Sequence, residues 1–345
     1  MENDNQIILQ AIGKAIEYRS TFFAYRMPGE QDLHFGAQII DSHIPIGFYI
    51  HPFVESIDSP MTYISAQFDA RKYLQLRLNK VSGKAITCQS TAKSEYFAKV
   101  GATIEKLRRG DLQKVVLSRV IVGDTGRRWV DVYCDMLKAY PQAFVFVFNS
   151  EDTGFWIGAS PERFLSCSDG KVSTMALAGT RKAGAEGEWS EKNIAEQQFV
   201  CSHIRSQFEA IGVECAEGQR YTKTAGNVQH LCTEFSANVR GWSQVEKLRS
   251  LLHPTPALAG TPTKQAVKHI TDTESHSRRY YGGYIGPIDA RGNFSYFVNL
   301  RSMQFCDSRY CVFVGGGITN KSVVEEEWEE TENKVSPLIK LLENE

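Results

Sequence analysis

The segment Lys114–Val122 reads Lys-Val-Val-Leu-Ser-Arg-Val-Ile-Val and is apolar at nearly every position. An apolar run without alternation, rich in β-branched residues, predicts a strand that is buried on both faces. A helix is expected just before it, over 96–109, because apolar residues recur there at helical spacing. These residues are Phe97, Val100, Ile104 and Leu107. The centre of the chain is therefore predicted to begin with a helix and a core strand.

Short strands separated by turn residues follow this core strand. Apolar segments lie at 143–148, 155–158, 164–167 and 171–177. Polar residues separate the first two, and Ser168-Asp-Gly170 is typical of a tight hairpin turn between the last two. We expect the four segments to form an antiparallel meander, so that sheet dominates the middle of the chain.

Helical spacing returns over 191–211. Val200, Ile204, Phe208 and Ile211 form its apolar stripe, and Glu196 lies one turn before Val200 at the edge of that stripe. Glutamates are mostly exposed, so Glu196 fits a surface acid, but this position also suits a carboxylate that faces packed protein.

The two ends of the chain give weaker patterns. A helix is expected over 7–18, followed by several weak strands up to about residue 90. Near the C-terminal end, strands are predicted over 295–301 and 310–314. Gly315-Gly-Gly-Ile318 is predicted to be a turn whose backbone amides could approach a ligand oxygen.

Composition excludes several classes of protein. The 345 residues are 42% hydrophobic, and 39 Lys and Arg balance 40 Asp and Glu, so the chain has no basic excess for nucleic acid or an acidic membrane. It shows neither a signal-peptide pattern nor an apolar run of membrane-spanning length. The eight cysteines have no metal-type spacing. We expect a soluble cytoplasmic protein with reduced thiols, acting on a small molecule.

The acidic run Glu325-Glu-Glu-Trp-Glu-Glu-Thr-Glu-Asn-Lys334 crowds six carboxylates around one tryptophan. On a helix, Glu327, Glu330 and Lys334 share one face. Two interpretations fit: a solvated acidic face, or a carboxylate cluster that holds a hard divalent cation such as Mg²⁺. Trp328 favours a helix that is packed on at least one side.

Two further ionisable residues lie within apolar segments. Lys114 heads the core strand, where it is either a general base with a pKa lowered by desolvation or a lysine that snorkels from the strand end. Glu162 lies on the tight connection Gly158-Ala-Ser-Pro-Glu-Arg163, where it could donate a proton or pair with Arg163. His230, His253 and His276 have no metal-ligand spacing and are expected to be structural.

These segments resemble the chorismate-utilising enzymes, and within them the isochorismate synthases. The resemblance covers roughly residues 95 to 340 and rests on motifs that occur in the same order and spacing. The motifs are Lys114-Val-Val-Leu-Ser-Arg119, Gly158-Ala-Ser-Pro-Glu162, Leu177-Ala-Gly-Thr180, Ser190-Glu-Lys with Glu196, His253-Pro-Thr-Pro-Ala-Leu-Ala-Gly260, Tyr281-Gly-Gly283, Asn299-Leu-Arg301, Gly315-Gly-Gly-Ile318 and Glu327-Trp-Glu-Glu-Thr331.

The resemblance implies one large α/β fold of the α+β type, in which two antiparallel sheets pack together with helices outside. Residues 1–90 would be a weakly matched N-terminal part of the same fold, and residues 91–345 the chorismate-binding catalytic region. The active site would lie in a cleft between sheet and helices.

The resemblance also assigns roles to residues at matching positions. Lys114 resembles the general base that activates water to attack C2 of chorismate, and Glu162 resembles the acid that protonates the departing C4 hydroxyl. Glu196 and Glu330 look like Mg²⁺ ligands, with Glu327 assisting through water. The substrate would contact the remaining matched residues, which are Gly179, Thr180, Ala257, Arg301, Gly315 and Lys334.

Two positions separate the branches of the family. Anthranilate synthases carry glutamine where this chain has Lys114, and aminodeoxychorismate synthases carry lysine where it has Ala178. Water as nucleophile implies an isochorismate synthase or a salicylate synthase, which also eliminates pyruvate; we favour the first. Neither a glutaminase subunit nor an oligomer is expected.

Alternatives from other classes are a catalytically silent chorismate-binding protein and a generic Mg²⁺-dependent hydrolase. The sequence carries no phosphate-cradling P-loop for the latter. It leaves open whether the product would feed menaquinone, siderophore or salicylate biosynthesis.

Overall fold

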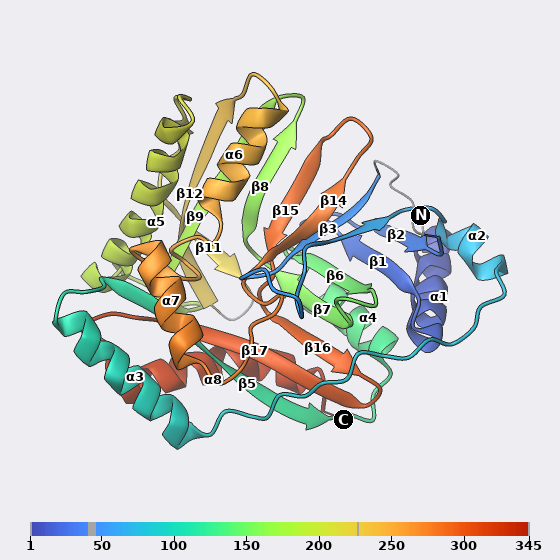
Figure 1. Cartoon of the computed structure of the whole chain (residues 1–345), viewed down its shortest axis with the longest axis horizontal. Helices are drawn as coiled ribbons and strands as arrows, with labels where there is room; N and C mark the ends of the chain where they lie inside the picture. Colours follow the sequence, from blue (N-terminus) through green and yellow to red (C-terminus); the bar gives the residue numbers. More distant parts are fainter. Residues whose placement is uncertain (1, 41–45, 226–227, 344–345) are drawn as a thin grey trace.

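Two antiparallel sheets form the body of the protein in the computed structural model, which describes residues 2–40, 46–225 and 228–343 (Figure 1). The first sheet runs in the order β13 (Gly260–Thr261), β5 (Lys114–Asp124), β17 (Arg309–Ile318), β16 (Ser302–Cys306), β7 (Phe155–Ser160), β6 (Phe144–Asn149), β1 (Thr21–Arg26) and β2 (Leu33–Gln38). The second runs in the order β10 (Ala216–Glu217), β12 (Val228–Asn238), β9 (Lys171–Lys182), β8 (Arg163–Ser168), β15 (Phe294–Val298), β14 (Tyr284–Ile288), β3 (Gly47–His51) and β4 (Thr62–Ser65), with β11 (Tyr221–Ala225) paired to β12.

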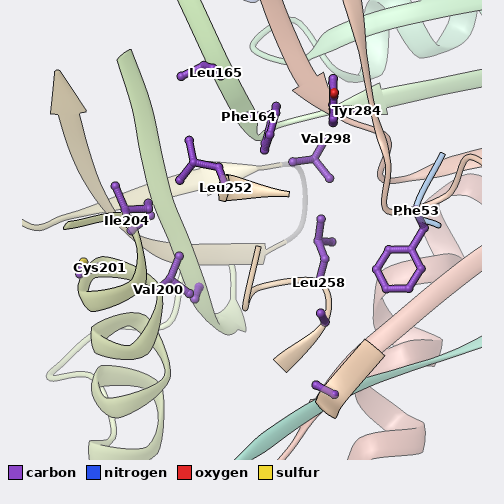
Figure 2. Packing of buried hydrophobic residues seen from close by; sticks show 14 of the residues in the cluster. Phe53, Phe164, Leu165, Val200, Cys201, Ile204, Leu252, Leu258, Tyr284 and Val298 are labelled. Atoms are coloured by element: carbon purple, nitrogen blue, oxygen red, sulfur yellow. The ribbon is translucent and has the colours of Figure 1, made fainter. Parts of the chain in front are cut away.

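Helices pack against the apolar faces of the two sheets. One group shares an apolar core with the first sheet: α1 (Glu2–Tyr18), α2 (Ala70–Gln75), α4 (Trp129–Ala139) and α8 (Val324–Lys340). A second group shares another apolar core: α3 (Lys93–Arg108), α5 (Glu191–Ala210), α6 (Trp242–Leu252) and α7 (Thr263–Thr273). Within this group, α5 packs on β9 and β12 of the second sheet, whereas α3 and α7 pack on β5 of the first. Figure 2 shows part of this second core, where Val200 and Ile204 of α5 approach Leu252 at the end of α6. The predicted fold class, two packed antiparallel sheets flanked by helices, is confirmed.

A third core of aromatic side chains fills the space between the sheets. Phe144, Phe146 and Phe148 all point inward from β6. The ring of Phe144 stacks on Phe297 of β15, with centroids 4.2 Å apart. Burial of each such side chain contributes about 1.5–3 kcal/mol, so this layer holds the two sheets together.

Several sequence predictions are confirmed. The core strand is β5, and its residues 114–120 are buried. The apolar stripe of the predicted second helix lies buried on α5, which begins after Ser190; the Ser190 side chain accepts a hydrogen bond from Asn193 N and so caps the helix. The first 90 residues add β1 and β2 to one sheet and β3 and β4 to the other.

The predicted four-stranded meander is wrong. β6 pairs with β7, and β8 pairs with β9, but β7 pairs with β16 of the first sheet and β8 with β15 of the second. The chain therefore crosses from one sheet to the other at Pro161. Proline has no amide hydrogen to continue a ladder, and the crossing leaves Glu162 buried between the layers.

The predicted glycine turn is also wrong. Gly315, Gly316 and Gly317 lie within β17 and pair with Ser118, Leu117 and Val116 of β5. Three successive glycines inside a strand provide no side chains for packing. Glycine occurs within strands where other groups approach the backbone closely. The groups that approach here are the ionisable side chains of the candidate site.

Candidate active site

A pocket opens where the end of the second sheet meets β17, α5 and α8. Its empty volume is about 810 Å³, part of it open to solvent. Eight of the eleven residues predicted for the site line it: Glu162, Gly179, Thr180, Glu196, Ala257, Arg301, Gly315 and Lys334. The other three, Lys114, Glu327 and Glu330, lie next to lining residues. Segments far apart in the sequence thus converge on one cavity.

Glu162 is held at the crossing between the sheets. It is buried, and its carbonyl oxygen accepts a hydrogen bond from Val298 N. Arg163 pairs with Glu234 instead, so the simple Glu162–Arg163 pair considered from the sequence is absent. Burial raises the pKa of Glu162 to about 8, although the charges of Lys114 and Lys223 oppose the rise. This carboxyl is therefore protonated near neutral pH and can act as an acid.

Lys114 and Glu196 form a buried ion pair. The Nζ atom of Lys114, at the start of β5, lies 2.7 Å from Oε1 of Glu196 on α5, and the lysine side chain is 1% exposed. Burial raises the pKa of Glu196, but the charge and hydrogen bond of Lys114 outweigh burial and hold that pKa below its ordinary value. The predicted surface role of Glu196 is therefore excluded, and this carboxylate is anionic.

Helix α8 turns two of its acids inward. Glu327 is buried and lies 3.1 Å from Lys192 Nζ, while Glu330 lies 2.7 Å from Lys334 Nζ. Burial and the charge of Glu330 raise the pKa of Glu327. The acids of the same run that face solvent are Glu325, Glu326, Glu329 and Glu332. One face of the run is thus solvated and the other enters the site, where the binding of a cation stays a prediction.

Trp328 is packed, as predicted. Its ring meets Tyr96 and Phe97 edge-on, and the guanidinium of Arg119 lies 4.0 Å from the ring centroid. These contacts fix the rotation of α8 about its axis. They therefore determine which of its carboxylates face the site.

The glycines of β17 make room for the charged groups. A Cβ on Gly317 would lie 2.8 Å from Glu196 Oε1 and 3.0 Å from Lys114 Cε. A Cβ on Gly316 would lie 3.3 Å from Glu327 Oε2 and 3.7 Å from Glu330 Oε1. A side chain at either position would push against the carboxylates, which explains why these two positions of β17 are glycine.

Cationic groups lie on another side of the pocket. Lys334 Nζ donates to the carbonyl of Gly315 at 3.0 Å, and burial lowers the pKa of Arg301. Arg301 Nη2 lies 3.5 Å from His230 Nε2, and His230 Nδ1 lies 3.0 Å from the carbonyl of Gly179. Burial, followed by the charge of Arg301, lowers the pKa of His230 to about 3, so the imidazole is neutral. An anionic ligand suits these cations.

His230 lines the pocket and is a site residue that the sequence interpretation missed. The same applies to Tyr281, which lines the pocket, and to Lys192, which pairs with Glu327. Lys192 lies four residues before Glu196 on α5, and that spacing could have indicated a shared face. No comparable pattern marks His230, because its place depends on the pairing of β12 with β9.

The carboxylates of the site meet some of the requirements of a hard divalent cation and not others. Among the described residues, no group of three His, Cys, Asp or Glu side chains is close enough to hold a metal ion as it stands. The three carboxylates are each paired with a lysine, but Glu327 Oε2 is buried without a hydrogen-bond partner. Buried carboxylates that repel each other are stabilised by a cation, and Mg²⁺ needs only one or two of them beside water.

The amino-acid sequence matches a known protein family. A model described as chorismate binding enzyme matches residues 51–343. The chain belongs to the chorismate binding enzyme family. Relatives include the isochorismate synthase MenF of Bacillus subtilis, 32% identical over 72% of this chain and 56% of that protein, and anthranilate synthase component 1 of Lactococcus lactis, 30% identical over 73% and 58%. The chain thus spans a little over half the length of these relatives.

Other members of this family are covered more fully. The isochorismate synthase EntC of Escherichia coli is 29% identical over 88% of this chain and 79% of that protein. The structure of MenF, the menaquinone-specific isochorismate synthase from Escherichia coli, superposes with a TM-score of 0.80 at 19% identity, over 97% of this chain and 91% of that chain. This superposition confirms the fold.

No helix among the described residues is long and apolar enough to cross a bilayer.

Proposed function

We propose that this protein is an isochorismate synthase, a hydroxymutase that converts chorismate into isochorismate. The observation that carries the proposal is the pairing of a protonated buried acid, Glu162, with a buried lysine, Lys114, at one pocket. One relative that bears this name, EntC of Escherichia coli, matches 88% of the chain. The exchange of one ring hydroxyl for another needs one group that gives a proton and one that takes a proton, and a buried acid and a buried lysine at the same pocket can divide these tasks.

The two groups divide the proton transfers between them. Lys114 would take a proton from water as its oxygen bonds to C2 of the ring. Glu162 would give its proton to the C4 hydroxyl as the C4–O bond breaks, so that water leaves and the ring keeps its charge. Lys114 can take this proton only when its Nζ atom is free to face the water, and that atom lies 2.7 Å from Glu196 Oε1. The pair must therefore open during turnover.

Substrate binding would rest on the cations and on backbone groups. Chorismate carries two carboxylates, and the planar fork of Arg301 and the point charge of Lys334 suit them. Gly179, Thr180, Ala257 and Gly315 line the pocket and would contact the ring and its oxygens. Gly179 has a φ of 71°, and a Cβ there would lie 3.0 Å from Asn193 O, so glycine lets β9 pass close to α5.

Mg²⁺ would be held by Glu196 and Glu330, with Glu327 acting through water. The unpartnered Oε2 of Glu327 and the mutual repulsion of these acids support the choice of a cation. When bound, Mg²⁺ would offset the clustered negative charge and hold the ring carboxylate of chorismate. The lysines now paired with these carboxylates would then be free to meet the substrate.

The nucleophile is proposed to be water. Lys114 stands where anthranilate synthases carry glutamine, and Ala178, which lines the pocket, stands where aminodeoxychorismate synthases carry lysine. We therefore propose that the protein acts in the cytoplasm as a monomer and without a glutaminase subunit. Its product would serve menaquinone, siderophore or salicylate biosynthesis.

Incubation of the purified protein with chorismate and Mg²⁺ tests the proposal. Isochorismate, followed by chromatography, should form only in the absence of EDTA, and a coupled assay should detect no pyruvate. Stoichiometric pyruvate would instead identify a salicylate synthase. Unchanged chorismate with Mg²⁺ present would contradict both activities and favour a silent chorismate-binding protein.

A further inference from the structure

One edge of the strand β5 is paired with another strand over a short stretch only. β17 pairs with β5 from Val115 to Asp124 on one side, but the two residues of β13 reach only Lys114 and Val115 on the other. Beyond this point, the carbonyl of Val116 and the amide of Ser118 face the open edge. Both residues are buried, so each of these backbone groups needs a hydrogen-bond partner inside the protein.

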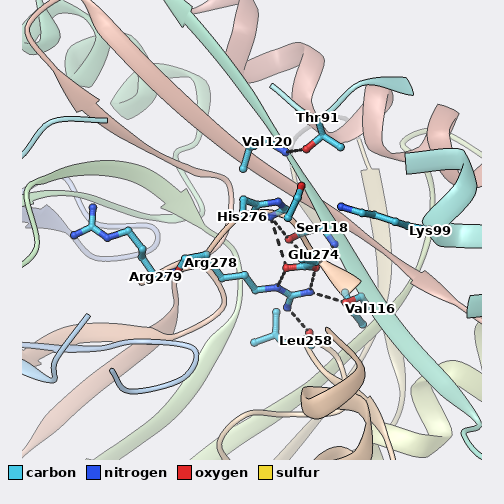
Figure 3. A network of polar contacts seen from close by, with 12 residues as sticks. Thr91, Lys99, Val116, Ser118, Val120, Leu258, Glu274, His276, Arg278 and Arg279 are labelled. Atoms are coloured by element: carbon cyan, nitrogen blue, oxygen red, sulfur yellow. Dashed lines mark hydrogen bonds and ion pairs between the residues drawn. The ribbon is translucent and has the colours of Figure 1, made fainter. Parts of the chain in front are cut away.

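Glu274 and Arg278 take the place of a neighbouring strand at this edge. The amide of Ser118 donates to Glu274 Oε1 at 2.6 Å, and the carbonyl of Val116 accepts from Arg278 Nη2 at 2.6 Å (Figure 3). An antiparallel neighbour would offer the same two groups, one acceptor and one donor. The two side chains therefore hold this stretch of β5 in place.

Arg278 and Glu274 also hold each other. Nε and Nη2 of Arg278 donate to the two oxygens of Glu274 at 2.9 and 2.6 Å, and both side chains are 3% exposed. Burial raises the pKa of Glu274, but the charge and hydrogen bonds of Arg278 outweigh burial and hold that pKa below its ordinary value. The pair is thus ionic, and its planar two-pronged contact leaves the guanidinium little freedom to rotate.

The remaining nitrogen of Arg278 reaches the wall of the active-site pocket. Nη1 donates to the carbonyl of Leu258 at 2.9 Å, and Leu258 lines the pocket beside Ala257, a proposed substrate contact. Val116 lines the same pocket from β5. One guanidinium therefore connects two walls of the cavity through their backbone carbonyls.

The strand side of this connection carries the proposed base. Lys114 and Val116 lie two residues apart on β5, so their side chains point to the same face of the sheet. A movement of Val116 relative to Leu258 would carry Lys114 with it. A displacement of about 1 Å at a reacting group can cost roughly 10²-fold in rate. The spacing that Arg278 fixes is thus the spacing between the base and the substrate.

We propose that Arg278, held by Glu274, is a positioning residue that sets the distance between Lys114 and the pocket wall at Leu258. This inference rests on the proposed function, because it takes Lys114 as the base. Arg278 acts through the backbone of the two walls and not by contact with the substrate. The role needs a guanidinium, because a lysine has one nitrogen and could not reach the Glu274 carboxylate and both carbonyls together.

Arg278→Lys tests this role, with Arg249→Lys as the matched control. Arg249 also binds a glutamate, Glu246, through two nitrogens, but its third donates to the hydroxyls of Tyr49 and Tyr284 in the second sheet. With chorismate as substrate, kcat should be about 10- to 100-fold lower in Arg278→Lys. KM should change less than about threefold, because the cations that meet the substrate stay in place. Arg249→Lys should keep the wild-type kcat.

Two results of these assays would overturn the proposal. One is a wild-type kcat in Arg278→Lys, and the other is an equal fall of kcat in both variants, each assayed below its thermal midpoint. Glu274→Gln is a second variant, which keeps the shape and one acceptor oxygen of the side chain but loses the charge, so kcat should fall less than in Arg278→Lys. If Arg278→Lys does not fold, an unchanged kcat in Glu274→Gln overturns the proposal.

Hydrogen exchange separates a failure of this inference from a failure of the proposed function. In peptides that cover residues 114–118 and 257–260, exchange should be at least about tenfold faster in Arg278→Lys than in the wild type and unchanged in Arg249→Lys. Unchanged exchange in Arg278→Lys would overturn the positioning role, whether or not the protein turns over chorismate. A wild type that leaves chorismate unchanged would instead contradict the proposed function, and the exchange rates would still decide whether Arg278 fixes the two walls.

Discussion

Lys114 Nζ lies 2.7 Å from Glu196 Oε1, and the lysine is buried beneath Gly317. The contact joins the first residue of a core strand to a helix that is separated from it by 82 positions in the chain (196 − 114). One partner is the proposed base, and the other is a proposed metal ligand. The two proposed roles therefore meet in one buried ion pair, in which each side chain offsets the charge of the other.

Lys114→Gln removes the partner of Glu196 and should show whether Glu196 is a metal ligand. Removing one partner of a buried ion pair costs about 3–5 kcal/mol because the other charge is left alone. Without Mg²⁺ the variant should therefore unfold at a lower temperature than the wild type. With excess Mg²⁺ most of that loss should be recovered if Glu196 is a metal ligand. Calorimetric unfolding with and without Mg²⁺ measures this, and an equal loss in both conditions would contradict the assignment of Glu196.

Glu162→Gln should remove the acid and keep the fold. A general acid typically contributes about 10²- to 10⁴-fold, so kcat should fall by that factor with little change in KM. In the wild type, kcat should decline as pH rises through about 8, because Glu162 then loses its proton. A pH–rate profile for both proteins checks this, and a wild-type kcat that stays level to pH 10 would exclude Glu162 as the acid, since roughly two units above its pKa it is ionised.

The same group predicts a change of stability with pH. The folded-state pKa of Glu162, about 8, lies above its ordinary value of 4.5, so the folded state binds the proton more tightly than the unfolded state between these values. Its contribution is full below pH 4.5 and is lost as pH rises toward 8. Denaturant unfolding should show the free energy of unfolding falling across this window less steeply in Glu162→Gln. Parallel curves for the two proteins would contradict the raised pKa.

Glu327→Gln should weaken the binding of Mg²⁺. The substitution removes one inward carboxylate, so the Mg²⁺ concentration for half-maximal stabilisation against heat should rise about tenfold. Glu329→Gln is the matched control, since Glu329 lies on the exposed face of the same helix. Thermal shift titrations with MgCl₂ make the comparison. An identical response of the two variants would show that Glu327 takes no part in holding the ion.

Gly317→Ala tests the glycine strand. Its Cβ would lie 2.8 Å from Glu196 Oε1, so the carboxylate and Lys114 must move, and activity should fall at least tenfold. Gly101→Ala on α3 meets nothing within 4 Å and should stabilise the protein by about 0.5–1 kcal/mol with unchanged activity. Chorismate turnover and urea unfolding measure both. Full activity of Gly317→Ala would mean that the carboxylates tolerate displacement.

Local patterns were enough for much of the fold. The buried strand from Lys114 and the apolar stripe from Val200 to Ile211 depend on periodicity, which sequence displays directly. The crossing at Pro161 and the extended Gly315–Gly317 segment depend on which strands pair, and a glycine run is equally compatible with turn or strand. Long-range pairing also placed His230 in the pocket, beyond the reach of any local pattern.

The site was predictable to the extent that motifs could be matched residue by residue. Eight of the predicted residues line one cavity. The pairing of Glu196 with Lys114 and of Glu327 with Lys192 was not foreseen, because each ion pair joins elements distant in sequence. Glu330 and Lys334 lie one turn apart on α8, and the sequence had placed them on one face. The ion pair of Lys114 with Glu196 is a feature that only the folded structure discloses.

Turnover of chorismate in water enriched with ¹⁸O tests the central claim most directly. If water attacks C2 and the C4 hydroxyl departs, isochorismate should contain one solvent oxygen, located at C2 by mass spectrometry and NMR. Isochorismate without label would contradict attack by water activated at Lys114, and recovery of unlabelled chorismate alone would contradict the synthase activity itself.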